Sequence, residues 1–138
     1  MTGPRVLFLS PFPERVVARA QKEFGAVLSQ DRVLPLEDAV AILNRTPTLQ
    51  ALVFSAHYRL DTAAISALPG TVKHLANASV GYDNIDLALA AKRGMVVTNA
   101  PGVLTDATAD LTLLLMLGAC RRMREYADIM NSGWERLY

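Results

Sequence analysis

The sequence predicts a single α/β domain built on a doubly wound parallel sheet. Short apolar runs alternate with helical patterns along the chain, and this alternation is typical of repeated βα units. The connecting segments are short, and the sequence contains no internal repeat, low-complexity tract or flexible linker. The chain has 138 residues, which is the length of one common domain with a buried core.

Five strands are expected where short apolar runs occur. The second is weak because only Val27 and Leu28 mark it. Prolines end the first run, and polar loops follow the others. The strands are expected at 6–9, 27–28 and 52–55, within 73–80, and at 95–98.

Five helices are expected between and after these strands. Gly25 closes the first, Asp61 caps the third, and Asp83 or Asn84 caps the fourth, because short polar side chains bind free amides and glycine ends helices. The helices are expected at 14–24, 36–43, 62–68, 85–92 and about 106–131.

The last predicted helix differs from the others. Between 107 and 120 its apolar residues occur on every face of the helix, so the helix should be buried on all sides. At 1.5 Å per residue the whole helix would be about 39 Å long, roughly the width of a domain of this size. We therefore expect a second domain or a second subunit, absent from this sequence, to pack on it.

The composition favours a soluble globular protein. Hydrophobic residues make up 51% and charged residues 20%, with a net charge of +1 and no basic stripe, so nucleic acid is a poor candidate partner. No segment has the pattern of a signal peptide or the length of a membrane span, and a cytoplasmic protein is expected. Cys120, the only cysteine, is expected to be a buried thiol, and no metal site is expected.

Two loops that follow predicted strands carry the main candidate site, because ligands bind beyond the carboxyl ends of parallel strands. In the segment 79–84, Gly81 would let the backbone approach a ligand and present amides to a carboxylate or phosphate. The alternative is an ordinary βα turn. In the segment 99–108, Thr105 is the expected N-cap, and Thr108 could meet an anion. The alternative there is simple capping.

Three further side chains are considered. His57 could donate a proton or contact a substrate, although most loop histidines are merely solvated, and Tyr58 could form a pocket wall. His74 begins a strand and is expected to be structural. Trp134, just after Gly133, could anchor an interface. The chain has no G-x-G-x-x-G, no G-x-x-x-x-G-K-[ST] and no G-x-S-x-G motif, so no complete catalytic apparatus is expected.

Two long segments carry a family resemblance. They are A-S-V-G-Y-D-N-I-D at 78–86 and K-R-G-M-V-V-T-N-A-P-G-V-L-T-D-A-T-A-D at 92–110. With them, the stretch from His74 to Trp134 resembles the D-isomer-specific 2-hydroxyacid dehydrogenases, particularly the glyoxylate and hydroxypyruvate reductase branch. Residues 1–73 agree with the family only in pattern and strand order.

The resemblance implies a domain organisation. Residues 1–104 would form a flavodoxin-like substrate domain with a five-stranded sheet. Residues 105–138 would form the interdomain helix and the start of a dimer arm that includes Trp134. The long helix would lead to a Rossmann nucleotide-binding domain that is missing from this sequence.

The resemblance also implies site residues. Val80 and Gly81 would approach the substrate carboxylate and the nicotinamide end of the cofactor. The loop with His57 and Tyr58 would line the substrate pocket, and Thr108 would contact the cofactor. The family's glycine-rich loop and its catalytic Arg, Glu and His lie beyond the point where this sequence stops, so no catalytic residue is assigned here.

The implied function is hydride transfer between NAD or NADP and a small 2-keto or 2-hydroxy acid, by a homodimer whose N-terminal part is inactive alone and does not bind the cofactor tightly. The choice between NAD and NADP, and the identity of the acid, stay open. A second hypothesis is a non-catalytic module that binds small acids or dimerises. A third is a truncated remnant that aggregates through its apolar helix.

Overall fold

The computed structural model describes residues 5–29 and 32–133. The chain divides into two units, Met1–Pro101 and Gly102–Tyr138, and each unit is described by itself. None of the helices in the described part is long and apolar enough to cross a membrane.

The first unit contains a parallel sheet, as predicted. Its strands are β1 (Arg5–Phe8), β2 (Leu49–Phe54), β3 (His74–Asn77) and β4 (Val96–Thr98), which lie in the order β1-β2-β3-β4. All three pairings are parallel. The four carboxyl ends therefore meet at one edge of the sheet.

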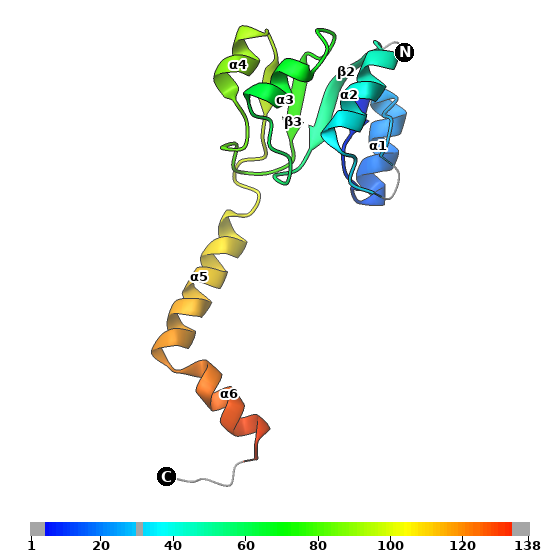
Figure 1. Cartoon of the computed structure of the whole chain (residues 1–138). Helices are drawn as coiled ribbons and strands as arrows, with labels where there is room; N and C mark the ends of the chain where they lie inside the picture. The colour runs from blue at the N-terminus through cyan, green and yellow to red at the C-terminus, as the bar shows by residue number, and fades with distance from the viewer. Residues whose placement is uncertain (1–4, 30–31, 134–138) are drawn as a thin grey trace. The chain divides into compact units, whose positions relative to one another are not determined.

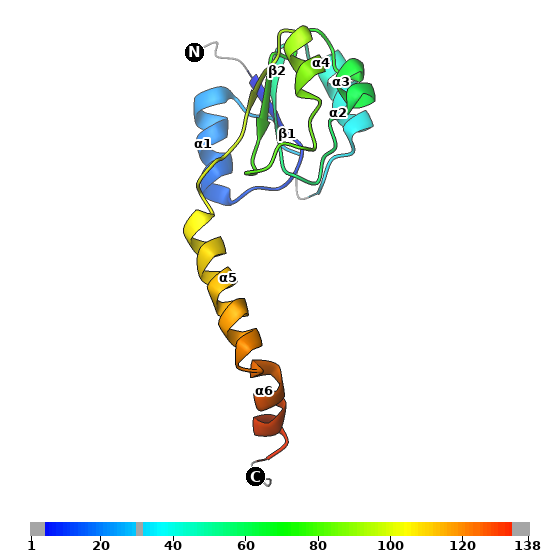
Figure 2. The same ribbon diagram turned by 90° about the vertical axis from the view of Figure 1, so that its left-hand side faces the viewer.

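The helices of this unit form a layer on each face of the sheet (Figures 1 and 2). Helix α1 (Glu14–Phe24) lies on one face, and α2 (Leu36–Arg45), α3 (Thr62–Ala67) and α4 (Leu87–Lys92) lie on the other. The strands lie in the sheet in the same order as in the chain. Right-handed crossovers between strands in this order place α2, α3 and α4 on the same face.

The core lies between the sheet and α2–α4. Alternate residues of the strands point to this face, and Leu7, Leu52, Phe54 and Leu75 have no exposed surface. The opposite face is covered by α1 over part of its width. It retains an apolar hollow of about 680 Å³ that is lined by α1 and by residues of β1, β2 and β3.

The predicted second strand at 27–28 is wrong, and the described sheet has four strands rather than five. Val27 forms a single parallel bridge with Leu7, through Phe8 N–H to Val27 O at 2.9 Å and Val27 N–H to Val6 O at 2.7 Å. The two residues before it are still bound to α1, since the amides of Gly25 and Ala26 donate to Gln21 and Ala20 carbonyls. Too little extended chain is left for a strand.

The helix caps agree with the sequence at α3 and differ at α4. The Asp61 carboxylate accepts from the Ala64 amide at 3.0 Å, so the predicted cap is confirmed. Helix α4 is capped by Asp86, not by Asp83 or Asn84. The chain around those two residues forms a turn in which Ile85 N–H donates to Tyr82 O at 3.1 Å, and this turn delays the start of the helix.

Asp86 should make the stability of the first unit depend on acid pH. The Leu89 amide, then the Thr62 hydroxyl, hold the pKa of Asp86 below its ordinary value. A depressed folded-state pKa stabilises the fold above the unfolded-state pKa of about 3.9, and the contribution is lost as pH falls through the folded value.

We therefore expect wild type to lose stability more steeply than Asp86→Asn as the pH falls from about 5 through the unfolded-state pKa and then the lower folded-state pKa. The asparagine keeps an acceptor for Leu89 but does not titrate. Urea unfolding midpoints at a series of pH values measure this difference. Parallel pH profiles for the two proteins would contradict the assignment.

The second unit contains two helices, so the single helix predicted at 106–131 is wrong. They are α5 (Thr105–Cys120) and α6 (Met123–Asn131). Arg122, between them, has φ 52°, a left-handed conformation that ends a helix. Thr105 is the first residue of α5 rather than its cap, since Leu104 holds the cap position without a side-chain bond.

The apolar side chains of α5 are exposed. Leu111 and the five residues Leu113–Leu117 are 53–64% exposed, and Cys120, expected to be buried, is also exposed. Helix α6 differs because its apolar residues Met123, Tyr126 and Met130 are interspersed with charged ones.

Candidate functional site

The candidate site lies in the loops that follow β2, β3 and β4. Strand β3 lies between β2 and β4, so the loop after β3 lies between the loops that follow β2 and β4. Hydrogen bonds hold this central loop, 78–86, to the loops on both sides.

Three successive carbonyls of the central loop are bound within the protein. The Ser79 carbonyl accepts from the Ala100 amide at 2.9 Å, and the Val80 carbonyl accepts from Asn99 Nδ2 at 2.9 Å. The Gly81 carbonyl accepts both from Asn77 Nδ2 and from the Ser79 hydroxyl, each at 2.8 Å. The loop is therefore fixed through its acceptors.

The amides of the same three peptide groups are unpaired. Among the described residues, Val80 N–H, Gly81 N–H and Tyr82 N–H have no hydrogen-bond partner. In a trans peptide the N–H points opposite to the C=O, and this region has no cis peptide. Because the Ser79 and Val80 carbonyls point to the loop after β4, the Val80 and Gly81 amides point away from it. Adjacent unpaired amides of this kind bind anions.

Gly81 is not required by a left-handed backbone, since it is absent from the residues with positive φ. A Cβ at this position would lie 3.2 Å from Asp83 Oδ1, which is a tight contact. The absence of a side chain thus leaves room beside Asp83 and keeps the amides accessible. All of Val80, Gly81 and Tyr82 are exposed.

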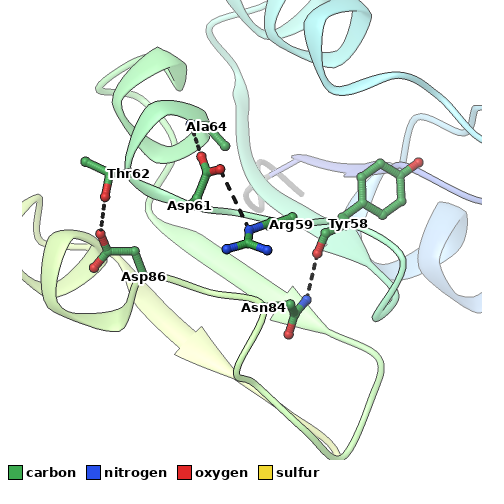
Figure 3. A network of polar contacts seen from close by, with 7 residues as sticks. All are labelled: Tyr58, Arg59, Asp61, Thr62, Ala64, Asn84 and Asp86. Carbon is green, nitrogen blue, oxygen red and sulfur yellow. Dashed lines mark hydrogen bonds and ion pairs between the residues drawn. The ribbon is translucent and has the colours of Figure 1, made fainter.

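The loop after β2 is joined to the central loop (Figure 3). Asn84 Nδ2 donates to the Tyr58 carbonyl at 2.7 Å, and the Thr62 hydroxyl donates to Asp86 Oδ2 at 2.7 Å. A parallel bridge between Leu60 and Ile85 adds two backbone bonds. These bonds therefore hold the segment that carries His57 in a fixed position relative to the segment that carries Gly81.

Tyr58 lies in the core rather than in a pocket wall. The residue is 7% exposed, and its hydroxyl bonds to the Leu34 carbonyl at 2.8 Å and also to the Leu9 carbonyl. Burial raises the pKa of this phenol, so it stays neutral and keeps the single proton that the two carbonyls share. Tyr58 thus anchors the loop after β2, and the residues on either side of it, His57 and Arg59, are exposed.

The remaining predicted residues are Thr108, Trp134 and His74. Thr108 lies in the first turns of α5, in the second unit, and Trp134 lies outside the described residues. His74 shares a hydrogen bond with Thr98 Oγ1 at 2.9 Å, which links β3 to β4. In the part of the chain that the structure describes, His, Cys, Asp and Glu form no group of three that could hold a metal ion.

Two asparagines that hold the central loop, Asn77 and Asn99, were not predicted as site residues. Asn77 could have been found from the alternation of β3, because it falls on the same face as Leu75, where a second apolar residue would be expected. Asn99 follows a strand directly and carries no comparable signal.

Comparisons with known proteins identify the family. The sequence matches the model of the D-isomer specific 2-hydroxyacid dehydrogenase catalytic domain over residues 6–131. The chain belongs to this family.

Its relatives include enzymes that act on small acids. The chain is 37% identical over 135 residues to the glyoxylate reductase of Thermococcus kodakarensis, covering 96% of this chain and 39% of the relative. It is 30% identical to the glycerate dehydrogenase of Hyphomicrobium methylovorum, covering 99% and 43%. The chain thus spans about two fifths of the length of these family members.

Solved structures of the family have the same fold. A glyoxylate reductase from Paecilomyes thermophila matches with a TM-score of 0.80 at 25% identity, over 96% of this chain and 43% of that one. An NADPH-dependent glyoxylate/hydroxypyruvate reductase from Sinorhizobium meliloti, in complex with NADP and malonate, matches with a TM-score of 0.72 at 29% identity, over 94% and 38%.

Proposed function

We propose that this chain forms the substrate-binding part of an oxidoreductase that transfers a hydride between NAD(P)H and a small 2-keto or 2-hydroxy acid of the glyoxylate or hydroxypyruvate type. In this proposal residues 1–104 are the substrate domain, and 105–138 are an interdomain segment and the start of a dimer arm. The observation that carries the proposal is the set of unpaired amides at Val80, Gly81 and Tyr82.

These amides suit a small carboxylate. A carboxylate bound by backbone N–H groups makes charge-assisted hydrogen bonds without a cationic side chain. Holding the carboxylate fixes the position of the adjacent keto carbon, and such positioning lowers the barrier of a later chemical step. His57, on the loop joined to this one, would contact the substrate from the other side, and Tyr58 would contribute by fixing that loop.

The cofactor would be held mainly by polypeptide outside these residues. The sequence has no glycine-rich loop to bind a pyrophosphate, so the chain by itself does not fit a dinucleotide. Val80 and Thr108 would add contacts to it. The hydride would come from the nicotinamide, and the chain's own contribution would be to bind and orient the acid. No catalytic residue is assigned in this chain.

The relatives support the substrate class. They include a glyoxylate reductase, a glyoxylate/hydroxypyruvate reductase and a glycerate dehydrogenase, and each of these names refers to a small acid with oxygen at carbon 2. The Sinorhizobium meliloti structure was solved with malonate, which is a small carboxylate.

A chimera tests the proposal. The 135 matched residues of the Thermococcus kodakarensis glyoxylate reductase would be replaced by this chain. The folded chimera is expected to oxidise NADH or NADPH in the presence of glyoxylate, while this chain alone and the remainder of the relative alone show negligible turnover. A chimera that melts cooperatively but is inactive, or measurable turnover by this chain alone, would contradict the proposal.

A second candidate is a non-catalytic dimerisation or small-acid-binding module. The exposed leucines of α5 favour association with another protein surface. This candidate expects self-association and carboxylate binding but no activity in the chimera, so the same experiment separates the two.

A further inference from the structure

Asn77 is a buried amide in an apolar position. It is 3% exposed, at the end of β3, and is paired in register with Phe54. The preceding residue on the same face is Leu75, which has no exposed surface. A leucine would continue this pattern, and burying an amide instead costs free energy unless its polar atoms are paired.

The amide of Asn77 is only half paired. Its Nδ2 donates to the Gly81 carbonyl at 2.8 Å, while its Oδ1 is buried and has no partner among the described residues. The Asn77 side chain therefore contributes less to the stability of the fold than an apolar residue would. Its one interaction fixes the orientation of the Gly81–Tyr82 peptide group.

That orientation determines what the loop presents. Because the Gly81 carbonyl is directed at Asn77, the Tyr82 N–H of the same trans peptide points the opposite way, and it follows the unpaired amides of Val80 and Gly81 in the sequence. We propose that Asn77 is a positioning residue, which acts through the Gly81 carbonyl to hold the amides of the central loop ready for a carboxylate. The ligand in this inference rests on the proposed function.

The substitution Asn77→Leu separates positioning from a structural role. A residue needed for stability would lower the melting temperature when replaced. We expect Asn77→Leu to keep or raise the melting temperature, to shift the backbone amide resonances of residues 80–82 in the free protein, and to weaken glyoxylate binding by roughly tenfold or more, the effect of losing one well-placed interaction.

Two further variants complete the test. Asn44→Leu makes the same change at an exposed position of α2 and should leave both the loop resonances and the glyoxylate affinity unchanged. Ser79→Ala removes the other donor to the Gly81 carbonyl without altering the core. It should weaken glyoxylate binding to a smaller extent, and it gives an answer even if Asn77→Leu does not fold.

The outcomes are distinct. A folded Asn77→Leu with unchanged loop resonances and affinity overturns the inference, as does an unfolded Asn77→Leu together with an unaffected Ser79→Ala. If wild type does not bind glyoxylate while Asn77→Leu still shifts the resonances of 80–82, the proposed function fails and the positioning role of Asn77 stands.

Discussion

Replacing Phe54 with alanine is expected to lower the free energy of unfolding by about 3–5 kcal/mol. Phe54 ends β2 on the core face, has no exposed surface, and lies edge-on to the Tyr58 ring with centroids 6.4 Å apart. The substitution would leave a cavity and remove the contact that supports Tyr58. A loss of this size is a large part of the roughly 5–15 kcal/mol that stabilises a typical domain.

Urea denaturation followed by circular dichroism measures this effect. Val96→Ala is the matched control, since Val96 lies in the same sheet but is 58% exposed, and it should change stability by no more than about 0.5 kcal/mol. A Phe54→Ala cost below about 1 kcal/mol would mean that the core does not close around β2 as described.

Charging α5 is expected to convert a self-associating protein into a monomer. Leu113 and Leu117 are 57% and 64% exposed and lie one turn apart on the same side of the helix. A contiguous apolar surface of this kind drives association. We expect wild type to self-associate at micromolar concentration, and the double substitution of Leu113→Lys and Leu117→Lys to abolish it.

Sedimentation velocity measures this change. The control adds the same two charges to α1, as Ala18→Lys with Gln21→Lys, at positions that are already exposed, and should associate as wild type does. Wild type that sediments as a monomer at micromolar concentration would show that the exposed leucines of α5 do not drive assembly.

Four strands of the first unit were predicted from the sequence because each contains a short apolar run. The runs at 52–54 and 74–77 are short and are followed by turn residues. This pattern is typical of buried strands. The prediction failed at Val27, where two apolar residues were too few to extend the sheet, and at Arg122, whose left-handed conformation divides the last helix. The shortness of the run at 27–28 is visible in the sequence, whereas the residue types around Arg122 carry no signal of a break.

The loops were harder to predict than the strands. The loop around Gly81 was selected from the sequence as a candidate site, and the structure adds that the φ of this glycine is ordinary and that a side chain there would crowd Asp83. Tyr58 was expected in a pocket wall and lies in the core, since its hydroxyl finds two carbonyls, Leu9 and Leu34, that are distant in sequence.

Titration of the ¹⁵N-labelled chain with glyoxylate, at constant ionic strength, tests most directly whether this loop receives a substrate carboxylate. The amide resonances of Val80, Gly81 and Tyr82 are expected to move together and to saturate in the millimolar range or below, and methyl glyoxylate, which lacks the charge, should not move them. Resonances that stay in place, or that move equally with the ester, would contradict the account.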